Sequence, residues 1–341
     1  MEIHRTTTQR AARRRQALGE CGKDRGALGS QTKPMNPTYA STVQLLLAIA
    51  PAIFETPLFA LKGGTALNLF VQDLPRLSVD IDVVFVRHDM ARDVALKAIK
   101  DELAAAKTRI ERMGFVAEVR QNKAGDEAKM FVTDDKSEVK VEVNFVFRGT
   151  VLPPVRTSLV AAAQALFAAN IEVPVLAIPE LYGSKLVAAM DRQHPRDLFD
   201  VQHMFDRFGL PPEFVDCFVA YLAGHNRPVH EVLFAQSQPL AEVFASEFVG
   251  MTATPVTLEQ LEATRARLFE SLPKALTPAH HTFLLSLVQA EPDWSQMPFA
   301  HLQELPAIRW KLMNLSKLKK TNTQRFIQQY DELAARLAAV V

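Results

Sequence analysis

The segment RLSVDIDVVFV, Arg76–Val86, places two aspartates two residues apart in an otherwise apolar stretch. Alternate side chains of a β-strand face the same side, so Asp80 and Asp82 would share one face and the neighbouring apolar residues the other. Two carboxylates whose Cα atoms lie about 7 Å apart repel each other unless a cation or solvent lies beside them. The segment therefore predicts a half-buried strand, residues 77–86, that presents a metal site or a solvent-exposed acidic face.

A glycine pair lies just upstream of this strand. Leu58–Lys62 predicts a short strand, Gly63 and Gly64 end it, and a helix is expected to begin at Thr65. A glycine turn at a helix N-terminus exposes backbone N–H groups and partial positive charge, which together bind phosphate. Each feature alone is common, as a simple turn or a solvated acidic face. Their combination is typical of a site for a triphosphate and Mg²⁺, because Mg²⁺ prefers a few carboxylates plus phosphate oxygens.

A third carboxylate is expected on a neighbouring strand. The run SEVKVEVNFVF, residues 137–147, alternates apolar and polar residues and places Glu138, Lys140, Glu142 and Asn144 on one face. Glu142 is the candidate metal ligand because it lies centrally in the strand, and Lys140 beside it would serve the phosphates or the carboxylates. The alternative is an exposed ladder of Lys and Glu.

The hydrophobic periodicity predicts an α+β fold in two parts. Residues 35–150 would form a mixed-sheet core, and residues 151–341 a mostly helical C-terminal domain. In the core we expect a first helix capped by Ser41 or Thr42 and a second helix over 90–113. Three strands are expected at 115–121, 128–134 and 137–147, with a hairpin turn at 122–127, and one further strand at 171–177.

Composition places the chain among ordinary globular proteins. It has 341 residues, of which 48% are hydrophobic and 23% charged. No apolar run approaches the roughly 18 residues that a membrane-spanning helix requires, so no membrane association is expected. The only cysteines, Cys21 and Cys217, lack metal-ligand spacing and suggest a reducing, cytoplasmic setting. Dinucleotide-binding and P-loop glycine patterns are absent.

The net charge of +1 conceals a basic N-terminal segment. Residues 1–34 hold eight Lys and Arg against three acidic residues, whereas the remainder holds 31 basic and 35 acidic residues. We interpret residues 1–34 as a disordered basic leader that precedes Met35, where periodic apolar residues begin. The alternative is an RNA-binding arm.

Four ordered blocks within residues 58–202 resemble the AbiEii/AbiGii family of nucleotidyltransferase toxins, which includes the MenT toxins. The blocks are LKGGTALNLF, RLSVDIDVVF, VKVEVNFVFRG and SKLVAAMDRQHPRDLFDV. The resemblance implies a nucleotidyltransferase-like core. It also implies transfer of NMP from an NTP to an RNA hydroxyl, at the tRNA acceptor end, with Mg²⁺ or Mn²⁺. Such a toxin would block translation and have a cognate antitoxin.

The resemblance also implies roles for individual residues, which we group by function. The nucleotide contacts would be Gly63, Gly64, Thr65, Arg76, Ser78, Lys185 and Arg192. The metal ligands would be Asp80 and Asp82, with Glu142 as the third acid. The catalytic set would be Asp80, Asp82, Lys185, Asp197 and Asp200, in which Asp197 or Asp200 either orients Lys185 or acts as a base.

A basic segment near the C-terminus, residues 309–325, surrounds Trp310 and contains no acidic residue. Basic residues around an aromatic side chain suit a nucleic-acid backbone, so Lys317, Lys319 and Lys320 are candidate RNA contacts. The alternative is a solvated helix face.

Two other function classes remain open. One is a nucleotidyltransferase that acts on a small-molecule or protein hydroxyl, and the basic segment argues mildly against it. The other is a non-catalytic nucleotide-binding module, which would have no need of closely placed, mutually repelling carboxylates.

Overall fold

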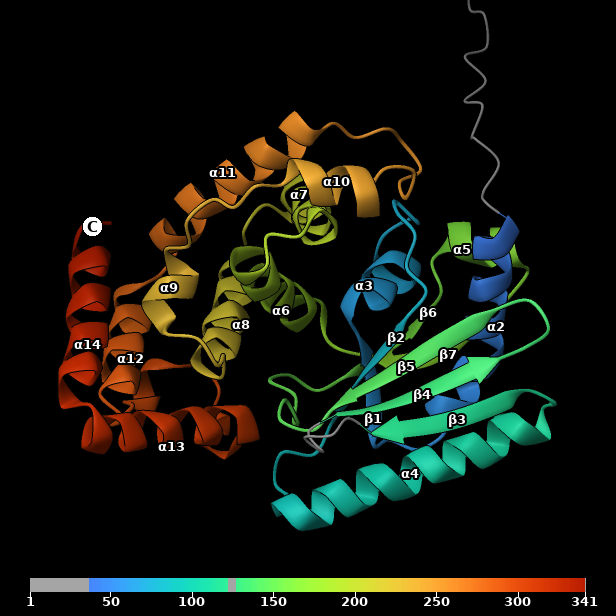
Figure 1. The fold of residues 1–341 in the computed structure, drawn as a ribbon, viewed down its shortest axis with the longest axis horizontal. Helices are drawn as coiled ribbons and strands as arrows, with labels where there is room; N and C mark the ends of the chain where they lie inside the picture. Colours follow the sequence, from blue (N-terminus) through green and yellow to red (C-terminus); the bar gives the residue numbers. More distant parts are fainter. Residues whose placement is uncertain (1–36, 122–126, 341) are drawn as a thin grey trace, which may run out of the picture. The chain divides into compact units, whose positions relative to one another are not determined.

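The strands of the described residues form a seven-stranded mixed sheet (Figure 1). The computed structural model describes residues 37–121 and 127–340, so the N-terminal leader and most of the hairpin turn predicted at 122–127 lie outside the described residues. The strand order is β3-β4-β5-β2-β1-β7-β6. The strands are β1 (Phe59–Lys62), β2 (Ile81–Phe85), β3 (Val116–Gln121), β4 (Glu127–Thr133), β5 (Glu138–Asn144), β6 (Val155–Ser158) and β7 (Glu172–Val175).

Strand β2 lies in the middle of the sheet, antiparallel to β1 and parallel to β5. Its apolar residues are all buried, and Asp82 is its one partly exposed residue. The strand is thus covered on both faces except at the carboxylate. The long half-buried strand predicted at 77–86 is wrong at its start, because Leu77 donates its N–H to Met251 O instead of joining the ladder. Asp80 therefore precedes the strand.

Strands β6 and β7 extend the sheet beyond residue 150. Strand β7 pairs with β1 in parallel, and β6 pairs with β7 in antiparallel fashion. Residues 36–341 form one compact unit by their contacts. The boundary expected at residue 150 consequently falls inside the sheet.

Helices before the long C-terminal helical region pack on this sheet. Helix α2 (Pro37–Ile53) contacts β5 and β7, and α4 (Arg92–Arg112) contacts β3. The predicted cap of the first helix at Ser41 or Thr42 is wrong, because the helix already begins at Pro37. Proline suits a first helical turn, where its missing N–H needs no partner.

The helix after β1 starts without an intervening loop. Helix α3 (Gly63–Ala66) begins at Gly63 and continues as a π-helical turn, η1 (Leu67–Val71). The expected start at Thr65 is wrong by two residues, and the two glycines are the first residues of the helix itself. Their N–H groups therefore belong to the unsatisfied first turn of a helix.

The remaining chain is helical apart from short connections. Helix α6 packs against both α7 and α8, and α14 buries Phe326, Leu333 and Leu337 against its neighbours. Within the described ranges, no helix combines the length and apolar character needed to cross a bilayer. These helices are α5 (Ala161–Phe167), α6 (Ile178–Asp191), α7 (Pro195–Phe208), α8 (Pro212–Ala223), α9 (Val229–Leu233), α10 (Ala241–Glu247), α11 (Leu258–Lys274), α12 (Pro278–Val288), α13 (Pro306–Thr321) and α14 (Thr323–Ala338).

Candidate functional site

A row of four charged residues, two acids between two lysines, crosses four strands of the sheet. Lys62 on β1 is opposite Asp82 on β2, and Asp82 is opposite Glu142 on β5. Glu142 is in turn opposite Lys129 on β4. Directly opposed residues share a face of the sheet. The row therefore places the predicted acids Asp82 and Glu142 side by side, with a lysine at each end.

Asp82 lies directly against the first glycine of α3. A Cβ atom added at Gly63 would overlap the Oδ2 atom of Asp82, and the φ angle of Gly63 is +75°. Burial raises the pKa of the Asp82 carboxyl, and the charges of Glu142 and Asp80 add to this rise while Lys62 opposes it. The close approach requires glycine at position 63 and holds a carboxylate beside a helix N-terminus.

Asp80 is positioned through its backbone. The Thr65 hydroxyl donates to the carbonyl oxygen of Asp80, and its Oγ1 atom lies 2.9 Å from Ser78 Oγ. The backbone N–H of Ser78 donates to the Tyr39 hydroxyl at 2.9 Å. Three predicted residues thus form one hydrogen-bonded turn. Tyr39 was missed because nothing near it in the sequence indicates that it contacts a turn 39 residues away.

Glu142 forms ion pairs with two lysines. Its carboxylate oxygens lie 2.7 Å from Lys140 Nζ and 2.9 Å from Lys129 Nζ. Lys140 Nζ also lies 3.6 Å from Asp80 Oδ2. Burial by itself would lower the pKa of Lys140, but its hydrogen bond to Glu142 and the surrounding carboxylates outweigh burial and raise that pKa. Lys140 therefore stays charged between the two acids.

The chemistry of the donors fits a hard divalent cation at Asp80 and Asp82. Carboxylate oxygens are the ligands that Mg²⁺ uses together with phosphate oxygens, and the two acids lie within reach of one lysine. In residues 37–121 and 127–340, no group of three or more His, Cys, Asp and Glu side chains is arranged to hold a metal ion. A role for Glu142 as a third ligand stays a prediction.

A buried ion-pair network lies behind the glycine turn and connects it to α6 and α7. Arg76 donates to both carboxylate oxygens of Asp200, from Nε and Nη2, each at 2.7 Å. Lys185 Nζ lies 2.8 Å from Asp197 Oδ1 and 3.0 Å from Asp200 Oδ2. Arg192 donates to the other oxygen of Asp197 at 2.8 Å. Five predicted residues, far apart in sequence, are therefore neighbours in the fold.

The acidic and basic side chains of this network are held in their charged forms. Burial alone would raise the pKa of Asp197, but Lys185 and Arg192 outweigh it and lower that pKa to about 2. Burial is likewise outweighed at Asp200, where Arg76 and Lys185 lower the pKa. A carboxylate with so low a pKa is a weak proton acceptor. The geometry thus suits Asp197 and Asp200 to orienting Lys185, the first of the two roles left open from the sequence.

A cleft of about 370 Å³ opens between the glycine turn and α6. Gly63, Gly64, Asp82, Lys185 and Arg192 line it, so it joins the row of charges to the buried network. Sequence reasoning missed the other lining residues. Lys62 would have been the easiest of them to predict, because it immediately precedes the glycine pair. The missed residues are Lys62, Phe147, Ser184, Val187, Ala188, Asp191, Tyr221 and His225.

The predicted RNA-contacting lysines lie on α13, and they do not share one surface. Lys317 and Lys320 line a shallow groove with Arg309 and Met313. Lys319 instead pairs with Glu291, with its Nζ 3.1 Å from the carboxylate. Only two of the three lysines thus present a common basic surface.

The Gly63→Ala substitution tests the contact between the glycine turn and Asp82. A side chain at a left-handed position costs about 1–2 kcal/mol of stability, and at Gly63 it must also displace the Asp82 carboxylate. We expect nucleotide transfer to fall at least about 100-fold, the scale expected for misplacing a reactive group by an ångström.

Gly209→Ala is the matched control. Gly209 has a φ angle of +71° and a ψ angle of −132°, with no atom within 4 Å of an added Cβ, so an alanine there is strained but displaces nothing. Both variants should lose stability in urea titrations, and only Gly63→Ala should lose activity. Equal activity of the two variants would remove Gly63 from the site.

Comparisons with known proteins agree with this architecture. The family model described as "Nucleotidyl transferase AbiEii toxin, Type IV TA system" matches residues 44–314. MenT4, a nucleotidyltransferase toxin from Mycobacterium tuberculosis H37Rv, is structurally similar, with a TM-score of 0.55 and 19% sequence identity. The similarity covers 82% of this chain and 95% of that chain. No curated protein sequence matches significantly. The family resemblance and the α+β nucleotidyltransferase-like fold are therefore confirmed.

Proposed function

Because the chain belongs to the AbiEii family of nucleotidyltransferase toxins of type IV toxin–antitoxin systems, we propose that it transfers NMP from an NTP to an RNA hydroxyl. The acceptor in this proposal is the 3′ end of tRNA. Modification there blocks aminoacylation and thereby translation, in the cytoplasm where tRNA is found. Because toxins of such systems are paired with an antitoxin, the proposal includes a cognate antitoxin as a partner.

The observation that carries this proposal is one cleft in which a helix N-terminus, a carboxylate and a buried lysine face the same space. The first N–H groups of α3, at Gly63, Gly64 and Thr65, bind the triphosphate as an anion. Thr65 and Ser78 keep this turn in place through their hydroxyl contact. The triphosphate is thus held against the face of the central strand on which Asp82 lies.

Lys185 and Arg192 provide the positive charge on the other side of the cleft. An ammonium group has three N–H donors, and Lys185 uses two of them on Asp197 and Asp200. The third donor is available for a phosphate oxygen. The buried Arg76 holds Asp200 from behind, so it fixes the direction of Lys185 in addition to supporting the Gly64 turn.

In the reaction, the acceptor hydroxyl oxygen forms a bond to the α-phosphorus, and the bond from that phosphorus to the bridging oxygen breaks. Pyrophosphate leaves, and the hydroxyl loses its proton. Lys185 offsets the charge that develops on the pyrophosphate, which preorganised cations do most effectively in a water-poor site. Asp80 and Asp82 would hold Mg²⁺, or Mn²⁺, whose contribution when bound is to lower the charge of the phosphates and the pKa of the hydroxyl.

A transfer assay tests this function. The protein is incubated with total tRNA and Mg²⁺, with each of the four α-labelled NTPs in turn, and the labelled product is mapped by nuclease digestion. We expect label at the 3′ end of tRNA from at least one NTP. Label on a protein or a small-molecule hydroxyl, with none on RNA, would favour the second class of nucleotidyltransferase instead.

The α13 lysines yield a separate prediction. Replacing Lys317, Lys319 and Lys320 with Gln should weaken tRNA binding and flatten its salt dependence, because each lysine that contacts phosphate releases a counterion. Each contact contributes a slope of about −0.7 on single strands, so up to roughly two units are lost if all three contact RNA. Lys319→Gln alone should have the smallest effect, since Lys319 is paired with Glu291. Salt titrations of tRNA affinity, with NTP affinity as control, measure this, and an unchanged slope would assign the lysines to a solvated face.

A further inference from the structure

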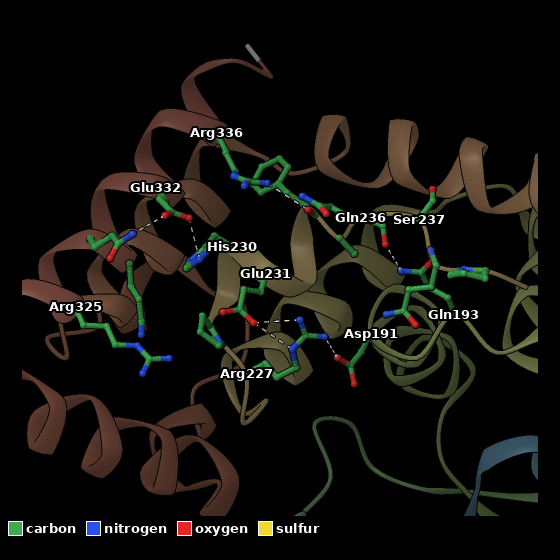
Figure 2. A pocket seen from close by; sticks show the side chains of 17 residues that line it. Asp191, Gln193, Arg227, His230, Glu231, Gln236, Ser237, Arg325, Glu332 and Arg336 are labelled. Atoms are coloured by element: carbon green, nitrogen blue, oxygen red, sulfur yellow. Dashed lines mark hydrogen bonds and ion pairs between the residues drawn. The ribbon is translucent and has the colours of Figure 1, made fainter.

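A polar groove of about 610 Å³ lies between α9 and α14, closed on its third side by the 234–239 loop (Figure 2). We call it the α9–α14 groove. Its walls carry three arginines, Arg227, Arg325 and Arg336, and a set of side-chain amides. Among its lining residues, Asp191 also lines the nucleotide cleft, and Arg325 is the last residue of the basic segment 309–325.

The groove and the nucleotide cleft share one wall. Asp191, at the end of α6, lines both of them. Arg227 holds this carboxylate from the groove side, with Nη1 2.6 Å from Oδ1, and His225 approaches it from the cleft side at 3.5 Å. A molecule that fills the groove therefore reaches a wall of the nucleotide cleft.

The turn that separates the two spaces is held by a buried lysine. Lys311 of α13 donates to the carbonyl oxygens of His225 and Arg227, at 3.0 and 2.6 Å. Burial lowers the pKa of this lysine to about 8. Lys311 belongs to the basic segment that the sequence associated with RNA, but here its charge supports the shared wall from inside.

The charged residues of the groove differ in their pairing. Arg227 is paired with Asp191 and Glu231. Glu332 accepts a hydrogen bond from Gln328 and lies 3.2 Å from His230 Nε2, and burial lowers the pKa of His230. In the part of the chain that the structure describes, no carboxylate lies within ion-pair distance of Arg325 or Arg336, and both are exposed. Arg336 lies over the Phe234 ring and donates to its carbonyl oxygen. Two cations thus remain available to a ligand.

This lining matches a particular class of ligand. The positive and negative side chains that line the groove are nearly equal in number. Such a lining suits a segment with few phosphates better than a triphosphate, which would require more positive than negative side chains. Amides at Gln236, Gln328 and Gln329 offer paired donors and acceptors. Unpaired RNA is recognised by hydrogen bonds to its base edges and by stacking on aromatic or guanidinium groups. An unpaired RNA end satisfies all of these features.

The size of the nucleotide cleft points in the same direction. At about 370 Å³ it lies at the small end of ligand sites, which span about 300–1,000 Å³. A transfer reaction needs two substrates at once, so a cleft of this size that holds an NTP leaves the acceptor to a neighbouring space.

We propose that the α9–α14 groove binds the unpaired 3′ end of the acceptor RNA and delivers its terminal hydroxyl past Asp191 to the nucleotide. This inference rests on the proposed function. Arg325 and Arg336 contact the phosphates of the unpaired nucleotides, and the glutamine amides contact their bases.

The test combines a protein variant with an altered RNA and compares the four resulting affinities. The variant Arg325→Gln/Arg336→Gln is compared with wild type for binding to an acceptor-stem hairpin that ends in four unpaired nucleotides, and to the same hairpin cut to a blunt end. We expect the variant to bind the overhang RNA about tenfold more weakly and the blunt RNA as wild type does. Its salt slope for the overhang RNA should fall by up to about 1.4, two contacts at 0.7 each.

The variant Arg92→Gln/Arg112→Gln is the matched control, since it removes two exposed arginines from α4 on the opposite part of the fold. It should leave both affinities unchanged. In transfer assays the groove variant should raise KM for RNA while kcat and NTP affinity stay near wild type. A loss that is equal for overhang and blunt RNA, or no loss, would overturn the groove assignment.

Wild-type behaviour separates this inference from the function itself. If wild type neither binds nor labels the overhang RNA, the proposed acceptor class is wrong and the groove assignment falls with it. If wild type labels RNA but the four affinities show no coupling, the function stands and the groove assignment alone is overturned.

Discussion

Asp80→Ala is expected to abolish nucleotide transfer, by at least about 1,000-fold or some 4 kcal/mol of transition-state stabilisation, without unfolding the protein. The side chain is 43% exposed, and among the described residues its one ion-pair neighbour is Lys140, at 3.6 Å. Removing it relieves repulsion with Asp82 and leaves Lys140 paired with Glu142. Substitutions at such positions change stability by about 0.5 kcal/mol or less.

Two measurements separate a metal role from a structural one. Binding of Mn²⁺ to the protein with a non-hydrolysable NTP should be lost in Asp80→Ala, as read by calorimetry, and growth inhibition should disappear with it. Asp73→Ala, which removes an exposed carboxylate from the loop before the strand, should retain metal binding, transfer and toxicity. A folded Asp80→Ala variant that is still fully toxic would refute the assignment of Asp80.

The second large effect is on stability. Asp200→Ala is expected to cost about 3–5 kcal/mol, because it leaves two buried cations without their shared carboxylate. Arg76 loses its bidentate partner, Lys185 loses one of its two carboxylate contacts and keeps Asp197, and both side chains are buried. Asp206→Ala, an exposed position on the same helix, should stay within about 0.5 kcal/mol of wild type.

A double variant tests whether unpaired buried charge causes the stability loss expected for Asp200→Ala. Asp200→Leu combined with Arg76→Met replaces the buried pair with apolar groups, and such replacements are often neutral in stability. We expect the double variant to recover most of the stability lost in Asp200→Ala, as measured by urea unfolding, yet to remain impaired in transfer because Lys185 loses its orientation. A double variant as unstable as Asp200→Ala would show that unpaired charge is not the cause. Full activity would remove Asp200 from the site.

The low pKa of Asp197 adds a pH dependence. Its pKa is about 2 in the fold against an ordinary value of 3.8, so the folded state favours the ionised form. The stability that the folded protein gains from ionised Asp197 and its cationic partners is complete above about pH 4. It is lost as the pH falls towards 2. The Asp197→Asn variant should show a flatter stability profile over that range.

The sequence by itself determined the local features of the site. The spacing of Asp80 and Asp82 predicted an extended segment with an acidic side, and residues 81–85 of it form β2. The glycine pair predicted a turn between a strand and a helix, and the helix begins at Gly63 itself. Both predictions follow from backbone geometry over a few residues. The alternation of apolar and polar residues around Glu142 likewise predicted the face of the strand on which Glu142 lies. The pairing of Glu142 with Asp82 in the sheet confirms that face.

Tertiary structure decided how distant segments combine. Arg76 and Asp200 are 124 residues apart, and their pairing exists only because α6 and α7 pack behind the glycine turn. The same packing placed Asp197 and Asp200 beside the buried Lys185 and Arg76. Packing also decided that Lys311 is internal while Lys317 is not, although both belong to one basic run. Local spacing sets the face on which a side chain lies, but only the packing of elements distant in sequence sets which charges meet and which of them lose their water.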